Sequence, residues 1–322
     1  MILILTINPL LEYRYSINNF IHPGNFRNTP LQLAAGGKGI NISRQLKKLS
    51  AESRDYYFAG GFAGKMFSEI LDNEGLRANF VKTKSDTRTA SVIIDNYNKK
   101  VTTIFSVNAD ISNSEKNEYL SKLEKMIQTC EILVCSGSSP CDNCNSIFPL
   151  ALSIANKYGK TSVLDTYGHH LPDCLNAKPT IVHLNQQEVT ESLTPDINSE
   201  TAMQTFLLDL YNKGIKQAFI TNGNKPFYAS NFDFIFKIFP PIVDEFDGTG
   251  SGDAFTAGII YGHYKDYTFE QSVRLACGLG ALNATRSSVC SGTAEESEKY
   301  SKGVSIEAVG KKMKLIDVTP TI

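Results

Sequence analysis

The sequence predicts an α/β protein with a mainly parallel central sheet, and three observations support that prediction. Short apolar runs alternate with amphipathic segments of helical period along most of the chain. Turns rich in glycine and polar residues separate these segments, as they do where helices connect the strands of a parallel sheet. The 322 residues, 42% of them hydrophobic, are enough for one large domain or two smaller ones.

Six apolar runs account for the expected buried strands, and amphipathic segments lie between them. The expected strands are residues 2–6, 56–59, 132–135, 162–165, 181–184 and 218–221. The clearest helical segments are residues 115–127, 145–158 and 201–211. In the first of these, Leu120, Leu123 and Ile127 recur at helical spacing, which predicts a helix with one buried face.

Three stretches depart from this alternation. Residues 13–32 have no helical period, and residues 89–95 and 101–106 resemble a hairpin. Together they predict either a small separate sheet, serving as a lid or an oligomer contact, or ordinary surface loops. Residues 227–230 and 234–239 predict an edge hairpin of the main sheet. We expect the tail, residues 295–322, to pack at least in part.

Composition argues against several classes of protein. Lys plus Arg number 32 and Asp plus Glu 33, so the net charge of −1 disfavours binding along a nucleic-acid backbone. No apolar run approaches the roughly 18 residues that a membrane span needs. The apolar start of the chain predicts a first strand rather than a signal peptide.

Seven cysteines, an odd number, do not form a disulfide framework, and we expect reduced thiols in a cytoplasmic protein. Cys141 and Cys144 form a CxxC pair. No second ligand pair follows at zinc-site spacing, so incidental cysteines are the preferred interpretation over a metal or redox site.

The strongest local signal is the stretch Asp247-Gly248-Thr249-Gly250-Ser251-Gly252-Asp253, which precedes a helical segment. Glycines before a helix expose backbone N–H groups at one spot, and the helix N-terminus adds partial positive charge. This pattern predicts an anion-binding site. Asp253 can be interpreted in two ways, as a helix N-cap or as a base that takes a proton from an attacking hydroxyl.

Smaller polar clusters accompany it. Gly36 to Asn41, with Lys38, suits a polyhydroxylated or phosphorylated ligand, or is a turn with an asparagine cap. Arg88 offers a guanidinium to a phosphate or carboxylate, and Ser138 follows an expected strand, where open parallel sheets bind ligands. Asn185 and Glu188 follow another strand and could order the waters of Mg²⁺. Neither a P-loop nor a dinucleotide-binding fingerprint is present.

Taken in order, these elements resemble the PfkB-type, or ribokinase-like, sugar kinases over nearly the whole chain. The matching motifs are TINP at 6–9, GGKGIN at 36–41, TRT at 87–89, GSSP at 137–140, NQQE at 185–188 and DGTGSGD at 247–253. The form of the GGKGIN motif is similar to that of the tagatose-6-phosphate kinase and 1-phosphofructokinase branch.

The resemblance implies a single ribokinase-like domain over residues 1–322. Its three α/β/α layers would surround a mainly parallel sheet, with a small β lid from about 10–32 and 88–106. It implies transfer of phosphate from ATP to a ketohexose phosphate: fructose 1-phosphate, tagatose 6-phosphate or fructose 6-phosphate. ATP and Mg²⁺ are the implied cofactors, with a monovalent cation as a further candidate. A homodimer formed through the lid is the implied assembly, without a nucleic-acid or membrane partner.

The resemblance also assigns roles to residues. Asp253 would be the base, beside an anion hole of backbone N–H groups from Gly250, Ser251 and Gly252. Glu188 and Asn185 would organise Mg²⁺ and the ATP phosphates through water. The other expected ligands of the nucleotide are Thr221, Gly223, Gly250, Gly252 and Asn283. The expected sugar ligands are Glu12, Gly37, Lys38, Asn41 and Ser138, with Arg88, and Arg27 from a partner's lid, holding the sugar's own phosphate.

Four positions depart from the family pattern. Glu12 replaces an aspartate that binds sugar hydroxyls, and His183 replaces a lysine near the nucleotide. Gly248 replaces a threonine, and Pro226 a glycine. Two alternatives therefore stay open: a kinase of the same fold for an unphosphorylated sugar or a nucleoside, and a non-catalytic regulator that binds a nucleotide or sugar.

Overall fold

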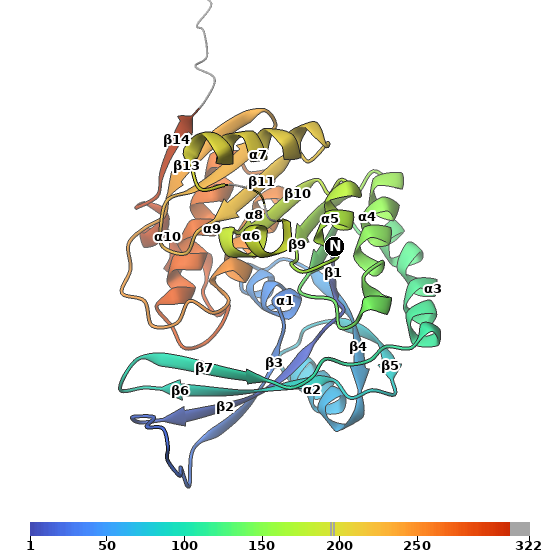
Figure 1. Cartoon of the computed structure of the whole chain (residues 1–322), viewed down its shortest axis with the longest axis vertical. Helices are drawn as coiled ribbons and strands as arrows, with labels where there is room; N and C mark the ends of the chain where they lie inside the picture. The colour runs from blue at the N-terminus through green and yellow to red at the C-terminus, as the bar shows by residue number, and fades with distance from the viewer. Residues whose placement is uncertain (194, 196, 310–322) are drawn as a thin grey trace, which may run out of the picture.

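The central sheet of the computed structural model, which describes residues 1–193, 195 and 197–309, is mainly parallel (Figure 1). Its parallel strands are β1 (Ile2–Thr6), β4 (Ser53–Gly60), β5 (Ala78–Thr83), β8 (Ile132–Ser136), β9 (Thr161–Asp165), β10 (Ile181–Asn185) and β11 (Gln217–Thr221). Beyond β11 the sheet continues with β12 (Phe227–Asn231), β13 (Phe234–Phe239) and β14 (Ser305–Val309), each antiparallel to the strand before it. Within the described residues, the order is β14-β13-β12-β11-β10-β9-β8-β1-β4-β5.

Helices cover both faces of this sheet because the side chains of its central strands are apolar on both faces. Leu3 and Leu5 of β1 face one buried cluster, and Ile2 and Ile4 face the other. The first cluster includes residues of α3 (Asn113–Thr129), α4 (Ile147–Lys157), α5 (Leu171–Asn176), α6 (Gln186–Leu193) and α7 (Glu200–Asn212). The second includes residues of α1 (Lys38–Lys48), α8 (Ser251–Tyr264) and α9 (Phe269–Ala284). The result is the three-layer arrangement that the sequence predicts.

Two further helices complete the body. α2 (Gly61–Asn73) packs its Phe67 and Leu71 against β4, and α10 (Ala294–Ser301) packs on α9. The short 3₁₀ helix η1 (Asp142–Cys144) precedes α4. Among the described helices, none has both the length and the apolar character needed to cross a membrane.

A second, smaller sheet lies below α1 in Figure 1. It consists of β2 (Leu10–Ile17), β3 (Leu31–Gly36), β6 (Arg88–Asp95) and β7 (Lys100–Phe105), in the order β3-β2-β6-β7 among the described residues. The parallel pairing of β2 with β6, from Leu10 opposite Arg88 onward, joins the two hairpins. The stretches without helical period therefore form a separate sheet, and we call this four-stranded sheet the lid.

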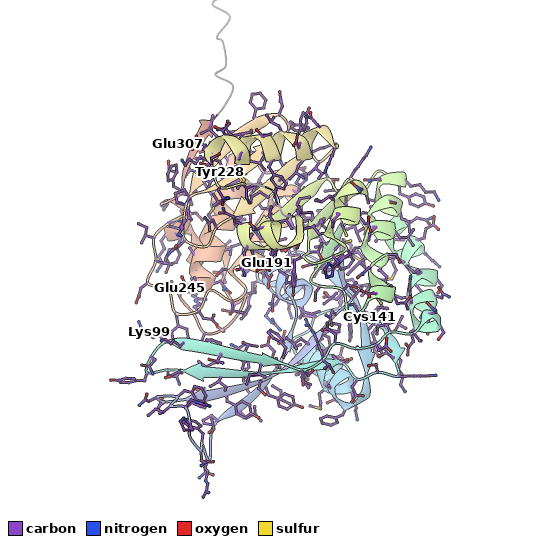
Figure 2. All side chains as sticks on the ribbon, in the orientation of Figure 1. Lys99, Cys141, Glu191, Tyr228, Glu245 and Glu307 are labelled. Carbon is purple, nitrogen blue, oxygen red and sulfur yellow. The ribbon has the colours of Figure 1, made fainter. Side chains whose placement is uncertain are left out.

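The lid contacts the body through the segment that leads into α8. Leu10, Val92 and Ile94 of the lid form an apolar cluster with Phe246. At the tip of the β6–β7 hairpin, the Lys99 Nζ lies 3.2 Å from an oxygen of Asp244. Figure 2 shows Lys99 beside the segment that carries Glu245. These contacts place the lid against the loop that holds the glycine cluster.

The structure corrects one expectation about the sheet. The pair β12 and β13 forms a hairpin of the main sheet, but β14 pairs with β13 and takes the edge position. The predicted tail thus supplies α10 and an edge strand; its last part, residues 310–322, lies outside the described residues. Strand β5 was missed because its sequence, ANFVKT, mixes polar with apolar residues at a sheet edge.

Candidate active site

The carboxyl ends of the parallel strands meet the N-termini of α1 and α8 at one edge of the main sheet. There Asp253 of α8 is buried with only 5% of its surface exposed, and Asn41 of α1 with 9%. The Asn41 Nδ2 donates a hydrogen bond of 2.8 Å to the Asp253 Oδ2. The two glycine-bearing motifs, more than two hundred residues apart, therefore meet at this carboxylate.

Asp253 is not the N-cap of its helix. The N-cap is Gly250, whose φ of 79° lies in the left-handed region, and Asp253 is the third helical residue. A Cβ on Gly250 would lie 2.2 Å from the Val289 Cγ1, so both the backbone conformation and the space require glycine. The N-cap interpretation of Asp253 is wrong, and its carboxylate is left to face Asn41 instead.

The first turn of α8 presents free backbone donors. Within the described residues, the N–H groups of Gly250, Gly252 and Asp253 make no hydrogen bond. The Ser251 N–H, expected in the anion hole, donates instead to the Gly248 carbonyl at 3.1 Å. The predicted donor set is thus corrected: Asp253 takes the place of Ser251, because the turn at 248–251 uses the serine N–H. Free donors at a helix N-terminus suit a phosphate.

Lys38 of α1 forms ion pairs with two carboxylates at this edge of the sheet, those of Asp165 and Glu188. Its Nζ lies 2.6 Å from the Asp165 Oδ1 and 3.1 Å from the Glu188 Oε1. Burial alone would lower the pKa of Lys38, but the carboxylates of Asp165, Glu188 and Asp253 outweigh it and raise the pKa above its usual value. Lys38 therefore stays protonated and supplies a fixed positive charge near Asp253.

The pKa of Asp253 is raised to about 6. Burial is the main cause, and the negative charge of Asp165 adds to it. Lys38, the Asn41 amide and His183 act in the opposite direction and limit the rise. A carboxyl group with this pKa is ionised at neutral pH and holds a proton more strongly than an exposed aspartate, as a general base requires.

His183, which departs from the family pattern, belongs to a buried network beneath the first turn of α8. Its Nδ1 lies 3.2 Å from the Asp165 Oδ2, and its Nε2 lies 3.0 Å from the Thr221 Oγ1. The Thr256 hydroxyl donates to the same Asp165 oxygen at 2.8 Å. A Cβ on Gly252 would lie 3.3 Å from the His183 Cε1, so the helix start rests closely on this ring.

Asn8 forms hydrogen bonds with two of the residues expected to bind the sugar, Arg88 and Ser138. The Arg88 Nη2 donates to the Asn8 carbonyl at 3.2 Å, and the Asn8 Nδ2 donates to the Ser138 Oγ at 3.0 Å. Asn108 accepts a hydrogen bond from each of Asn8 and Arg88. The Arg88 Nε is buried without a hydrogen-bond partner in the described part of the chain. The structure thus brings Arg88 and Ser138 together.

Glu12 lies on β2 of the lid, above Gly36. Its Oε2 accepts a hydrogen bond of 2.7 Å from the Arg14 Nη1, and the Arg14 Nη2 donates to the Ser287 carbonyl at 3.0 Å. Arg14 therefore neutralises the longer carboxylate that replaces the family's aspartate. Arg27 lies in the exposed loop between β2 and β3, so a role of Arg27 in a partner's site stays a prediction.

Residues 6–296 match the family described as "pfkB family carbohydrate kinase". The chain belongs to this family. It is 26% identical over 287 residues to a tagatose-6-phosphate kinase of Staphylococcus epidermidis, covering 88% of this chain and 92% of that protein. It is 29% identical over 295 residues to a 1-phosphofructokinase of Borreliella burgdorferi, covering 90% and 94%.

Solved structures of pfkB kinases have the same fold. Escherichia coli phosphofructokinase-2 in complex with substrates and products superposes with a TM-score of 0.83 at 21% identity, over 94% of this chain and 98% of that one. The same enzyme in complex with potassium gives a TM-score of 0.85 at 20% identity, with the same coverage. The ribokinase-like prediction is confirmed, and the protein is a carbohydrate kinase.

Glu188, the carboxylate predicted to act on the nucleotide side, forms reciprocal hydrogen bonds with Asn185. Its Oε2 accepts the Asn185 N–H at 2.9 Å, and the Asn185 Oδ1 accepts the Glu188 N–H at 2.8 Å. Within the described residues, His, Cys, Asp and Glu side chains nowhere gather in threes around a metal position. Mg²⁺ takes oxygen ligands and keeps several waters when phosphates share its coordination, so this sparse donor set fits an ion held through water.

Asn283, predicted to bind the nucleotide, holds the glycine-rich turn before α8, and its role toward a nucleotide stays a prediction. Its Nδ2 donates to the Thr249 carbonyl at 2.8 Å, and its Oδ1 accepts the Cys290 N–H at 2.7 Å. Thr221 is tied to His183, whereas Gly223 lies exposed in the loop after β11 with a φ of 58°. Among the residues predicted to bind the nucleotide, Gly223 therefore has a backbone that is exposed and accessible to a ligand.

Sequence reasoning missed several residues of this site, and two of them had a usable signal. Asp165 and Tyr167 come directly at the end of an expected strand, where ligands bind in open parallel sheets. The Tyr167 ring is 39% exposed and lies 5.9 Å from the Lys38 Nζ. Arg14 and Thr256 gave no such signal, because only the folded lid and helix bring them to the site.

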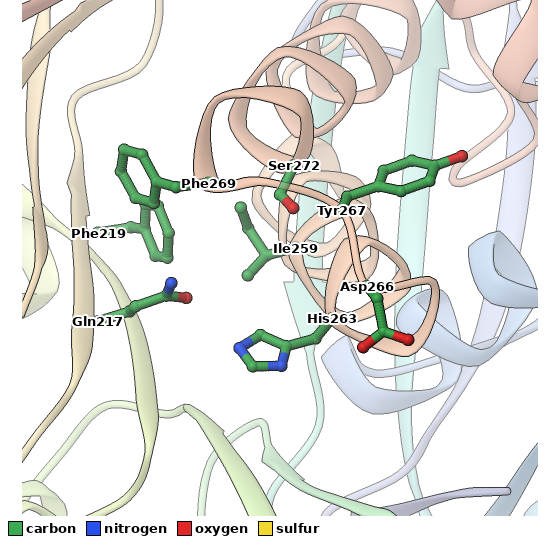
Figure 3. Close-up of a pocket in the computed structure, with 8 residues that line it drawn as sticks. All are labelled: Gln217, Phe219, Ile259, His263, Asp266, Tyr267, Phe269 and Ser272. Atoms are coloured by element: carbon green, nitrogen blue, oxygen red, sulfur yellow. The ribbon is translucent and has the colours of Figure 1, made fainter.

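A separate cavity of about 240 Å³ lies away from this edge (Figure 3). Its lining includes Gln217, the first residue of β11, and His263, in the last turn of α8. The candidate active site lies at the opposite ends of the same two elements. The cavity therefore has no part in the site.

All seven cysteines, each within the described residues, are free thiols, and Cys290 lies at the site, where its Sγ is 3.6 Å from the Gly250 carbonyl oxygen. The Cys141 and Cys144 sulfurs are 3.8 Å apart.

Proposed function

We propose that this kinase transfers the terminal phosphoryl group of ATP to a hydroxyl of a ketohexose phosphate, giving a bisphosphate. Fructose 1-phosphate, tagatose 6-phosphate and fructose 6-phosphate are the candidate acceptors. The observation that carries the proposal is the buried Asp253 carboxylate, held by Asn41 directly beside the free N–H groups of Gly250 and Gly252. The names of the two curated relatives support the acceptor class.

Asp253 would act as the general base. One of its oxygens is occupied by the Asn41 amide, and the other has no hydrogen-bond partner in the described part of the chain. That free oxygen can take the proton of the acceptor hydroxyl as its oxygen attacks the phosphorus. The N–H groups of Gly250, Gly252 and Asp253 would stabilise the charge on the transferring group, with Lys38 adding a positive charge.

The acceptor would lie between Asp253 and Arg88. Arg88 and Ser138 belong to one cluster around Asn8, and the guanidinium suits the phosphate that the sugar already carries. A phosphate bound there puts the reacting hydroxyl at the other end of the sugar. Gly37, Lys38 and Asn41 would bind the hydroxyls between, and Glu12 would do so together with Arg14.

Mg²⁺ would neutralise charge on the ATP phosphates, with Glu188 and Asn185 holding it through water. A monovalent cation is a further proposed cofactor, because one structural neighbour was solved in complex with potassium. A homodimer through the lid, with Arg27 reaching a partner's site, and a cytoplasmic location belong to the same proposal.

The test measures ADP release from MgATP across a panel of sugars and sugar phosphates, for the wild type and for Asp253→Asn. We expect turnover on one ketohexose phosphate and a loss of about 10²- to 10⁴-fold in the variant, as for removal of a general base. ATP binding should change little. Turnover only on an unphosphorylated sugar or a nucleoside would overturn the acceptor class, and near-full activity of Asp253→Asn would overturn the base.

A further inference from the structure

Asn41 contacts Asp253 through an amide group that has two nearly identical orientations. In the structure its NH₂ donates to the carboxylate, which stabilises the ionised form. Turned by half a rotation, the amide would present its carbonyl oxygen to the carboxylate, and two acceptors would face each other. The base therefore depends on whatever fixes the orientation of this amide.

Arg44, one turn further along α1, fixes it. The Arg44 Nη1 donates to the Asn41 Oδ1 at 3.0 Å. A guanidinium has only donors, so the Asn41 carbonyl must face Arg44 and the NH₂ must face Asp253. In the turned amide, the NH₂ group would face the guanidinium, so that two donors oppose each other. The carbonyl oxygen would face the Asp253 carboxylate, so that two acceptors oppose each other as well.

Arg44 is itself held firmly. Its Nε and Nη2 donate to the two oxygens of Glu74, at 2.9 and 3.1 Å, and Nη2 also donates to the Ala35 carbonyl at 2.9 Å. Glu74 caps the end of α2, and Ala35 lies on the lid strand that leads into the GGKGIN motif. The Arg44 side chain is 17% exposed, so water competes little for these bonds.

We propose that Arg44 is a positioning residue of the phosphoryl transfer: it orients the Asn41 amide so that Asp253 is held ionised with one oxygen free for the acceptor. This inference rests on the proposed function. Arg44 acts through Asn41 and touches neither Asp253 nor the acceptor.

The other charged and titratable groups that face Asp253 stay the same in the test. They are Lys38 on α1, Asp165 on β9, His183 on β10 and Cys290 after α9. The Arg44 charge also opposes the rise in pKa that burial causes at Cys290 and at Asp55 on β4, so the double variant below, rather than the pH profile alone, shows whether the effect comes through Asn41.

The experiment is a double-mutant cycle of Arg44→Gln with Asn41→Ala, measured as kcat and KM for each substrate and as the pH profile of kcat/KM. A glutamine side chain can donate or accept, so it no longer selects one amide orientation. We expect Arg44→Gln to lower kcat about tenfold to hundredfold and to move the acidic limb of the profile to higher pH, with the KM for ATP unchanged. In the Asn41→Ala background, Arg44→Gln should have no further effect on kcat.

Glu74→Gln is the matched control, because it removes the charge of the ion pair and leaves the Arg44–Asn41 hydrogen bond. It should stay within about twofold of the wild type in kcat, although thermal unfolding will report some loss of stability. Should Arg44→Gln not fold, Arg44→Lys provides the same cycle, because one ammonium cannot hold Glu74 and Asn41 in the planar arrangement of a guanidinium.

Equal losses of kcat from the Arg44 substitution in both backgrounds would overturn the proposal, as would a Glu74→Gln variant as impaired as Arg44→Gln. An unchanged Arg44 variant would overturn it too. If the wild type itself transfers phosphate to no acceptor of the panel, the proposed function has failed instead, and the two failures are thereby distinguished.

Discussion

At the scale of single residues, the proton affinity of Asp253 sets the pH range of the reaction. Burial raises its pKa to about 6 from an ordinary value of 3.8. A base works only when ionised, so kcat/KM should fall about tenfold per pH unit below pH 6. A pH profile of kcat/KM on the best acceptor checks this. Full activity down to pH 4 would show that another group takes the proton.

The proposed binding of the acceptor's phosphate by Arg88 predicts a difference between phosphorylated and unphosphorylated acceptors. Arg88→Ala removes charge-assisted hydrogen bonds, and the KM for a sugar phosphate should rise about tenfold to hundredfold with kcat changed much less. Steady-state kinetics with a sugar phosphate and its unphosphorylated parent measure the effect. Arg77→Ala, which removes an exposed guanidinium on the edge of the body, is the control. Equal losses with both acceptors would contradict phosphate binding by Arg88.

Part of the site could be predicted from the sequence because glycine motifs act through backbone and sit at fixed places on strands and helices. The family resemblance assigned Asn41 and Asp253 to one site, and the structure shows in addition that the two side chains are hydrogen-bonded. Arg14 and Arg44 could not be predicted in the same way. Arg14 needs the loop after α9, which carries Ser287, and Arg44 needs the end of α2, which carries Glu74; no local sequence pattern encodes either contact. The Ser251 N–H was misassigned because the turn at Gly248 is a property of the folded loop.

At the scale of secondary-structure elements, a pair of tyrosines joins β4 to α3. The Tyr56 hydroxyl donates to the Tyr119 carbonyl and the Tyr119 hydroxyl to the Tyr56 carbonyl, both at 3.1 Å. The rings stack with their centroids 4.0 Å apart, and both side chains are fully buried. The helix α3 is thus fixed on the sheet by directed bonds as well as by apolar contact.

Tyr119→Phe should lower the free energy of unfolding by about 1–3 kcal/mol, because it leaves a buried carbonyl without its donor. Denaturant unfolding of the variant and the wild type measures the loss. Tyr97→Phe, at a side chain 77% exposed, should stay within about 0.5 kcal/mol of the wild type. Equal stability of all three proteins would show that the reciprocal bonds contribute nothing net.

At the scale of the whole molecule, stability should depend on pH through Asp55, a group outside the active site. Asp55 lies on β4, is fully buried, and neither of its oxygens has a hydrogen-bond partner among the described residues. Burial raises its pKa to about 7, although Ser43 and Arg44 partly offset the effect. In the unfolded chain the same carboxyl releases its proton near pH 4.

The folded state therefore binds more protons than the unfolded state between about pH 4 and pH 7, and stability should decrease as the pH rises through that window. Asp55→Asn, which is neutral at every pH, should remove this decrease and stabilise the protein by a few kcal/mol at pH 8. Thermal unfolding from pH 4 to pH 8 measures it. Asp209→Asn, at an exposed position, is the control. Parallel curves for wild type and Asp55→Asn would contradict the assignment.

The overall fold was more predictable than its edges. The central strands are apolar on both faces, so runs such as residues 2–6 stand out and were placed correctly. Edge strands bury less apolar surface and mix polar with apolar residues, so their sequences are harder to recognise. For this reason β5 was missed, and β14, which pairs outside the predicted edge hairpin, was missed as well. From residue pattern alone, the lid segments predicted either a separate sheet or surface loops. The pattern did not decide between them because the β2–β6 pairing joins residues 78 positions apart in the sequence.

That parallel pairing also sets the order in which the protein can assemble during synthesis. The lid needs β7, which ends at Phe105, so it can close only after the first third of the chain has left the ribosome. Asp253 and the glycine-rich helix start are made much later. A nascent chain can thus pair the four lid strands, which carry Glu12 and Arg88, before it carries the groups that would transfer phosphate.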